Sequence, residues 1–157
     1  MRVLIAMLAA ALALAGATSV SARDEDATAP VVAASSASPL RVPLVFDTLL
    51  DQVEQLSETD DWEPFRPGVT AHWLYKEPNG GPAAVLLRYE PGARVPLHEH
   101  VGYEHIYILQ GDQYDERGSY PAGSFVINPP GTRHSPGSKN GCIALLIYEK
   151  AVKFVAP

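Results

Sequence analysis

The chain has 157 residues, of which 46% are hydrophobic and 19% charged, so it suits one ordinary domain and is not wholly disordered. Its net charge of -6 excludes the strongly basic surface of a nucleic-acid-binding protein, so no nucleic-acid partner is expected. A single cysteine excludes an internal disulfide and a zinc site built on paired cysteines.

Residues 1–22 are typical of a secretory signal peptide. An apolar run at 3–15 follows Arg2, and small residues end at Ala22, directly before a polar stretch that begins at Arg23. A helix needs about 20 apolar residues to cross a bilayer, so an uncleaved N-terminal anchor is the less favoured alternative. We therefore expect an exported protein, periplasmic or secreted, with no membrane span after cleavage.

Two segments are expected between the signal peptide and the main domain. Residues 23–40 are rich in Ala, Ser and Pro without an apolar period, which predicts a flexible linker. Residues 41–61 predict a helical N-terminal extension. Within 44–57, apolar residues recur at spacings of three and four, namely Phe46, Leu49, Leu50, Val53 and Leu56. This period is typical of a short amphipathic helix packed on the outside of the main domain, while binding of a partner is the alternative.

Residues 62–157 predict a single β domain. Short apolar or alternating runs recur about every ten residues, at 70–77, 83–90, 94–100, 103–110, 123–128 and 141–148. Turn-forming residues such as Pro91-Gly92 and Gly111-Asp112 separate them. This pattern indicates an antiparallel sandwich or barrel.

A cluster of metal-ligand side chains is expected within this domain. His98 and His100 are two apart on a predicted strand, so both imidazoles project from the same face. Glu104 opens the next run, and His134 joins from a distant segment. Together these four predict a site for one divalent metal ion, and Glu104 is the candidate for a catalytic role.

The remaining chemistry-bearing residues have simpler interpretations. By alternation His105 faces away from Glu104, so we expect a structural role. His72, on an early strand, is expected to be an ordinary polar residue. Cys142 is expected to be a small buried hydrophobic residue.

These spacings resemble the two sequence motifs of the cupin superfamily. The first motif is matched by Gly92, His98, His100, Glu104 and Gly111, and the second by Gly123, Pro129, Gly131 and His134. Ser138 stands where that family usually carries Asn. The resemblance implies an all-β double-stranded β-helix, the single-domain cupin jelly roll. It also implies a homodimer.

Within the cupins, the stretches PGARVPLHEH and YILQGDQYDERGSYPAGSFVINPPGTRHSPGS are most similar to the ChrR-like branch. That branch includes a zinc-binding domain of an anti-sigma factor and relatives that are dioxygenases. An exported protein could not hold a cytoplasmic sigma factor, so this sigma-binding role is not expected here.

The imidazole and carboxylate ligands suit zinc, iron or manganese and do not choose among them. With iron or manganese, we expect a dioxygenase-like oxidoreductase acting on a small organic substrate. With zinc, which is redox-inert, we expect a non-catalytic sensor or ligand-binding protein. Both hypotheses stay open on the sequence alone.

Overall fold

The structure, a computed structural model, describes residues 39–59 and 61–156. The predicted signal peptide at 1–22 and all but the last two residues of the predicted linker at 23–40 lie outside the described residues. In the part of the chain that is described, no helix has the length and hydrophobicity needed to cross a membrane.

The described chain contains one helix followed by short strands. The helix α1 spans Leu49–Ser57. The strands are β1 Glu63–Arg66, β2 Val69–Lys76, β3 Ala83–Tyr89, β4 His98–Glu99, β5 Glu104–Asp115, β6 Gly118–Pro121, β7 Phe125–Asn128, β8 Arg133–His134, β9 Cys142–Tyr148 and β10 Lys153–Phe154. The predicted all-β fold with a short N-terminal helix is therefore confirmed.

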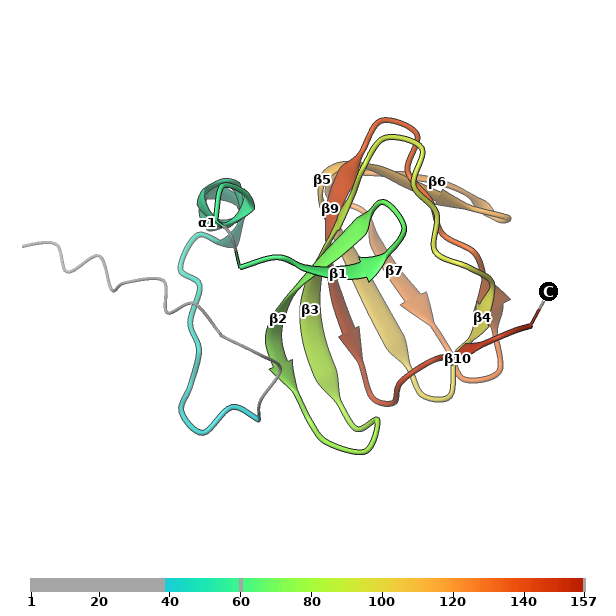
Figure 1. Cartoon of the computed structure of the whole chain (residues 1–157), viewed down its shortest axis with the longest axis horizontal. Helices are drawn as coiled ribbons and strands as arrows, with labels where there is room; N and C mark the ends of the chain where they lie inside the picture. Colours follow the sequence, from blue (N-terminus) through green and yellow to red (C-terminus); the bar gives the residue numbers. More distant parts are fainter. Residues whose placement is uncertain (1–38, 60, 157) are drawn as a thin grey trace, which may run out of the picture. The chain divides into compact units, whose positions relative to one another are not determined.

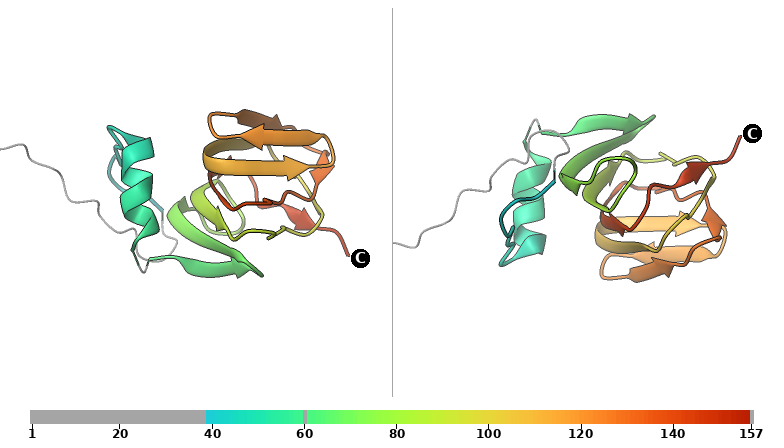
Figure 2. Two further views of the ribbon diagram at one scale, coloured as in Figure 1. Left: turned by 90° about the horizontal axis from the view of Figure 1, so that it is seen from above. Right: turned by 90° about the horizontal axis from the view of Figure 1, so that it is seen from below.

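The strands form two sheets in which every pairing is antiparallel. The larger sheet has the order β1-β2-β3-β9-β5-β6, and β7 also pairs with β5. The smaller sheet has the order β10-β4-β8. Figures 1 and 2 show that the larger sheet curls so that β4 and β10 lie across from β2 and β3, which is the jelly-roll arrangement.

The predicted break at Gly111-Asp112 is wrong, because β5 continues through both residues to Asp115. The strand passes this point with an irregular register between Ile108 and Gln110, which is typical of a β-bulge. Gly111 has a φ of 71°, and a Cβ there would lie 2.1 Å from the carbonyl oxygen of Gly141. The glycine therefore permits close packing within a strand instead of ending it.

The strand predicted at 94–100 is mostly irregular, and only His98–Glu99 pairs as β4. Pro96 lacks a backbone N–H and so cannot donate to a ladder at that point. Four strands were not predicted: β1, β6, β8 and β10. β8 and β10 have only two residues each, and β1 (EPFR) and β6 (GSYP) each hold a single aromatic residue, so none of the four shows a hydrophobic period.

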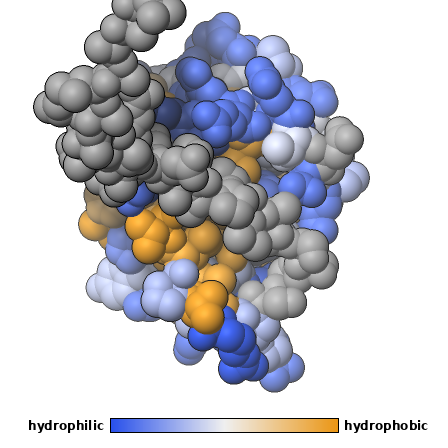
Figure 3. All heavy atoms as spheres, turned by 90° about the vertical axis from the view of Figure 1, so that its left-hand side faces the viewer, coloured by the Kyte–Doolittle hydropathy of each residue, from blue (hydrophilic) through white to orange (hydrophobic). Residues whose placement is uncertain are grey.

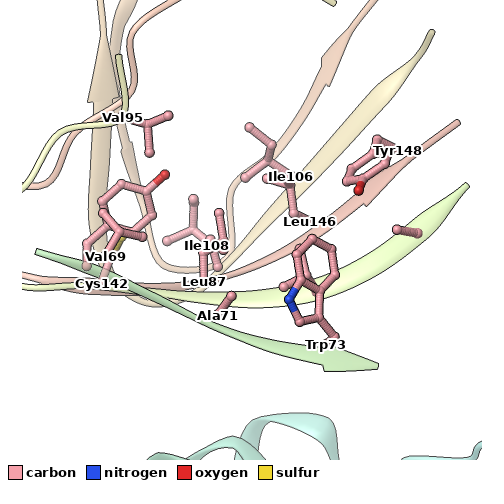
Figure 4. Packing of buried hydrophobic residues seen from close by; sticks show 14 residues of the cluster. Val69, Ala71, Trp73, Leu87, Val95, Ile106, Ile108, Cys142, Leu146 and Tyr148 are labelled. Atoms are coloured by element: carbon pink, nitrogen blue, oxygen red, sulfur yellow. The ribbon is translucent and has the colours of Figure 1, made fainter. Parts of the chain in front are cut away.

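The main core lies between the two sheets. Residues directly opposite one another on neighbouring strands point to the same face, and Trp73, Val85, Leu146 and Ile106 form one such row across β2, β3, β9 and β5. Figure 4 shows Trp73, Leu146 and Ile106 on one face of the sheet, with the helix on the other face. The side chains of this row form one wall of the barrel interior.

Helix α1 covers the outer face of the larger sheet. Val53 and Leu56 are fully or almost fully buried there, in one cluster with Leu74 and Leu86. The helix begins at Leu49 instead of in the predicted stretch from 44, because Thr48 has a non-helical backbone. Leu44 and Phe46, which precede the helix, still pack on the same cluster although they are not helical.

Exposed apolar side chains accompany this helix. Leu50, which belongs to the predicted apolar period, is 52% exposed, and Val42 and Val45 are also exposed. Figure 3, which views the side of the molecule where α1 lies, shows apolar surface between hydrophilic regions. The buried stripe of the helix is therefore narrower than its sequence period indicates.

Candidate metal centre

Four side chains from separate elements converge inside the barrel. His98 lies on β4, His100 directly after it, and Glu104 begins β5. His134 ends β8 and is paired with His98 across the small sheet. Each of the four residues is at most 3% exposed, and their ligand atoms all lie within 4.8 Å of one another. The structure thus brings together all four residues that the sequence nominated.

A tight turn aligns the segments that carry these residues. The amide of Gly131 donates to the carbonyl of His100 over 2.8 Å, and the amide of His100 donates to the carbonyl of Thr132 over 3.0 Å. Gly131 has a φ of 83°, a conformation that residues with a Cβ rarely adopt. The glycine therefore lets the turn before β8 bind the backbone of His100 directly.

The hydrogen bonds of His98 and His100 determine which nitrogen carries the proton. Nδ1 of His98 lies 2.9 Å from the carbonyl oxygen of Pro96, which can only accept. Nδ1 of His100 lies 2.9 Å from Oγ1 of Thr132, and that hydroxyl donates its own proton to the carbonyl of Pro129 over 2.7 Å. In their neutral form both imidazoles therefore carry the proton on Nδ1, which leaves the lone pair of Nε2 free.

Nδ1 of His134 also has an acceptor, supplied by the ion pair of Asp115 and Arg117 at the end of β5. Nδ1 of His134 lies 3.2 Å from Oδ2 of Asp115, whose side chain is 1% exposed. The Nη2 group of Arg117 is 3.3 Å from the same nitrogen, but it donates to Asp115 and, over 2.9 Å, to Oδ1 of Asn128. His134 therefore donates to the carboxylate. Such carboxylate–histidine contacts orient metal ligands in proteins.

The carboxylate of Glu104 is held in place and ionised. Its Oε2 accepts a hydrogen bond of 3.0 Å from Nδ2 of Asn128 and lies 3.0 Å from Nε2 of His100. Burial acts to raise the pKa of Glu104, but the nearby His100 and His134 outweigh it and hold this pKa well below its usual range. Burial in turn lowers the pKa of His98, which favours its neutral ring.

These side chains fit a divalent cation. Nε2 of His100 and Nε2 of His134 are buried and have no hydrogen-bond partner. A buried polar atom without a partner costs about 1–3 kcal/mol, and a metal ion would accept both lone pairs. Three neutral imidazoles and one carboxylate suit zinc, iron or manganese, so the donor set leaves the metal's identity open.

A cavity of about 370 Å³ opens onto the cluster. His98, Glu104 and His134 contribute to its lining, while most of its wall is apolar and aromatic, including Trp73, Leu146 and Tyr148. Figure 4 shows Tyr148 beside Leu146 on the inner face of the sheet. The volume lies near the lower end of small-molecule pockets, which span about 300–1,000 Å³. The cluster is thus accessible to a small organic molecule.

The residues that hydrogen-bond to the four ligands were not predicted from the sequence. Thr132, Asp115 and Asn128 each hold a predicted ligand, yet none belongs to a ligand motif. Asn128 is paired with Glu104 between β7 and β5, so only the strand register could have identified it.

The other nominated residues lie outside the cluster. His72 is buried, with Nδ1 3.2 Å from the carbonyl oxygen of Asp61. His105 stacks between Tyr103 and Phe125, as expected for a residue that faces away from Glu104. Cys142 is buried, and burial raises the pKa of its thiol to about 12.

Comparisons with known proteins agree with this geometry. Residues 52–152 match the ChrR cupin-like domain family. The anti-sigma-E factor ChrR of Cereibacter sphaeroides is 33% identical over 109 residues, which are 68% of this chain and 50% of that protein. The chain therefore spans about half the length of this curated relative.

Solved structures show the same fold. An RmlC-like cupin protein of Ralstonia eutropha JMP134 is 27% identical, with a TM-score of 0.55 over 60% of this chain and 66% of that one. An acetylacetone dioxygenase of Acinetobacter johnsonii is 14% identical, with a TM-score of 0.59 over 76% of this chain and 80% of that one. The second likeness is one of fold alone.

Proposed function

The chain belongs to the ChrR cupin-like domain family, and we propose that it is an exported, metal-dependent oxidoreductase of the dioxygenase type that acts on a small organic substrate. The proposed ligands of its single divalent ion are His98, His100, Glu104 and His134. Iron or manganese is the proposed metal, because zinc would not support oxidation.

One observation carries the proposal: the buried ligand cluster forms part of the wall of a cavity large enough for a small molecule. A purely structural metal site is usually closed by protein ligands. Here two of the three imidazoles and the carboxylate line the cavity, so a substrate could reach the ion. Access of this kind is what a catalytic site requires.

The residues around the ion have distinct proposed roles. A bound iron or manganese ion would supply Lewis acidity and redox chemistry. Glu104 lines the cavity, so its carboxylate could accept a proton from a substrate hydroxyl as well as bind the ion. Tyr148 lies directly opposite Glu104 on β9, and burial followed by the nearby carboxylate raises its pKa. Its hydroxyl therefore stays protonated and can donate to a substrate oxygen.

A non-catalytic zinc-binding sensor is the second candidate. It is favoured by the similarity to a relative whose name describes an anti-sigma factor. We do not propose that this chain binds a sigma factor, because the proposed export would separate the two proteins. In this candidate the cavity would bind a small ligand without converting it.

The test begins with elemental analysis of protein purified from its native compartment without added metal. We expect about one equivalent of iron or manganese, and oxygen uptake with enolate or phenolic substrates. His100→Ala and His134→Ala should each lose the metal, while His105→Ala, a histidine outside the cluster, should keep it. Full metal content in both cluster variants would refute the ligand assignment.

The two candidates give opposite results in the same experiment. Zinc in the native protein, no oxygen uptake from iron-loaded protein across a broad panel, and a melting temperature raised by a small ligand would favour the sensor. Oxygen uptake that disappears in His134→Ala would favour the oxidoreductase.

Two further proposals concern location and assembly. Export is proposed from residues 1–22. The chain should be found in the periplasm or medium, and deleting these residues should retain it in the cytoplasm.

A homodimer is proposed from the cupin resemblance and predicts a sedimentation mass twice that of the processed chain.

A further inference from the structure

Two cations that lack carboxylate partners lie at the edge of the cavity, and we call Lys76 and Arg66 the cationic rim. Both line the cavity and both are half-buried. The Lys76 ammonium lies 4.2 Å from the ring centre of Trp73, and the Arg66 guanidinium lies 4.2 Å from that of Phe154. Aromatic rings thus hold both charges in place beside the cavity.

The cationic rim differs from three arginines that are paired with carboxylates. Arg94, Arg117 and Arg133 each form an ion pair with a carboxylate. None of the ion pairs among the described residues includes Lys76 or Arg66. Exposed lysines without partners are ordinary, but a half-buried cation that faces a cavity gains from a bound anion.

The strand register places Lys76 in the same row as Glu104. Lys76 is opposite Ala83, Ala83 is opposite Tyr148, and Tyr148 is opposite Glu104. Three steps between neighbouring strands correspond to about 14 Å along the sheet. Lys76 and Glu104 therefore face the same cavity from two separated positions.

Arg66, at the end of β1 in the larger sheet, contacts the small sheet through Phe154 of β10. The ring of Phe154, on which its guanidinium rests, lies 5.7 Å from the ring of His98, and the two residues are paired between β10 and β4. Besides Glu104, Glu63 is the one acidic residue among those that line the cavity, and its Oε1 accepts from Nε1 of Trp73 over 2.5 Å. The cationic rim and Glu63 together carry one net positive charge.

We propose that the cavity binds a small organic acid, with its carboxylate attracted by the positive charges of Lys76 and Arg66 and an oxygen group at its other end directed at the His98–Glu104–His134 side. The apolar walls between the two ends fit a hydrocarbon or aromatic body. A single net charge at the rim matches a monoanion better than a phosphate dianion. The assignment of the oxygen end rests on the proposed function, because that end requires a bound metal.

The test uses the full chain as purified and a matched pair of probes, para-hydroxyphenylpropionate and its neutral amide. Isothermal titration calorimetry should show that the acid binds about tenfold more tightly than the amide, as a charge-assisted hydrogen bond in a half-buried site would give. Lys76→Gln and Arg66→Gln should each reduce this preference and leave the affinity for the amide unchanged. Lys139→Gln is the control, because Lys139 also lies over an aromatic ring, that of Tyr114, but does not line the cavity.

Metal content is measured in every variant, so that this inference and the proposed function can fail separately. Equal affinity for acid and amide, or an unchanged preference in both rim variants, would overturn the organic-acid assignment even if the metal is retained. A charge-dependent preference in a protein that binds no metal would support the rim assignment and would overturn the metal-dependent function.

Discussion

At the scale of single residues, the chemistry of the centre depends on three Nδ1–H groups that point away from it. Each of the three imidazoles donates to a different kind of acceptor: a backbone carbonyl, a hydroxyl and a carboxylate. These contacts set the ring orientation and leave Nε2 free for a cation. Removing one acceptor should therefore weaken metal binding without removing a ligand.

Thr132→Val is the sharpest test of this point, because valine keeps the shape of threonine and removes the acceptor for Nδ1 of His100. We expect zinc affinity, measured by competition with a chelating dye, to fall about tenfold or more. Thr70→Val, which removes a hydroxyl that accepts from Arg88, is the control and should bind zinc normally. Equal affinity in the two variants would show that Thr132 does not orient the ring.

Cys142 gives a prediction about pH. Burial raises the pKa of its thiol from about 9 to about 12, so the folded state favours the protonated form. The resulting stabilisation is fully present below pH 9 and is lost as the pH rises toward 12. Between about pH 8 and about pH 10.5, the free energy of unfolding should therefore fall less in Cys142→Ala than in the unchanged chain.

Urea unfolding at the two pH values measures this difference. Thiol labelling at about pH 8 gives a second readout, because the buried thiol should react only after unfolding. Parallel pH dependences in the two proteins would contradict the prediction.

At the scale of elements, α1 and the barrel have separate tasks. The helix packs on the outer face of the larger sheet, while the ligands and the cavity lie on the inner face. Its last turn is tied to the sheet, since Arg88 donates to the carbonyl of Ser57 over 2.7 Å and Trp62 donates to that of Leu56 over 2.7 Å. Damage to the helix should therefore change stability and leave the metal centre intact.

Leu56→Ala tests this separation. Leu56 is 2% exposed, and removing its buried methyl groups should lower the free energy of unfolding by about 2–3 kcal/mol. Leu50→Ala makes the same change in the same helix at a position that is 52% exposed, and should cost less than about 0.5 kcal/mol. Urea unfolding compares the two, and equal losses would mean that α1 is not docked as described. Metal content should be unaffected in both.

At the scale of the whole molecule, the barrel encloses charged and polar groups that need a cation. The four ligand residues are buried, and two of their nitrogens have no partner. A metal that binds only the folded protein stabilises it by about 4 kcal/mol when free metal is a thousandfold above its Kd. The metal should therefore couple the two sheets energetically as well as serve the site.

Removal of the metal with a chelator should lower the melting temperature, and adding metal back should restore it. His134→Ala should melt at the same temperature with and without metal, because it lacks one ligand. Differential scanning calorimetry measures both effects. A melting temperature that does not respond to metal in the unchanged chain would show that the cluster binds no ion tightly.

Much of the fold and of the candidate site could be predicted from the sequence. The longer strands were predicted because they have enough residues to show a period, whereas β8 and β10, with two residues each, do not. Gly111 was misinterpreted as the end of a strand, since a glycine in a bulge and a glycine in a turn look the same in the sequence.

The four residues of the cluster could be identified from the sequence. The two-residue spacing of His98 and His100 depends on local geometry alone, whereas Glu104 and His134 fit the spacings of the two cupin motifs. The cavity, its cationic rim and the contacts of Thr132, Asp115 and Asn128 became visible only in the folded barrel. Those contacts join strands that are distant along the chain, and their pairing depends on how the whole barrel closes. No local pattern of residues contains that information.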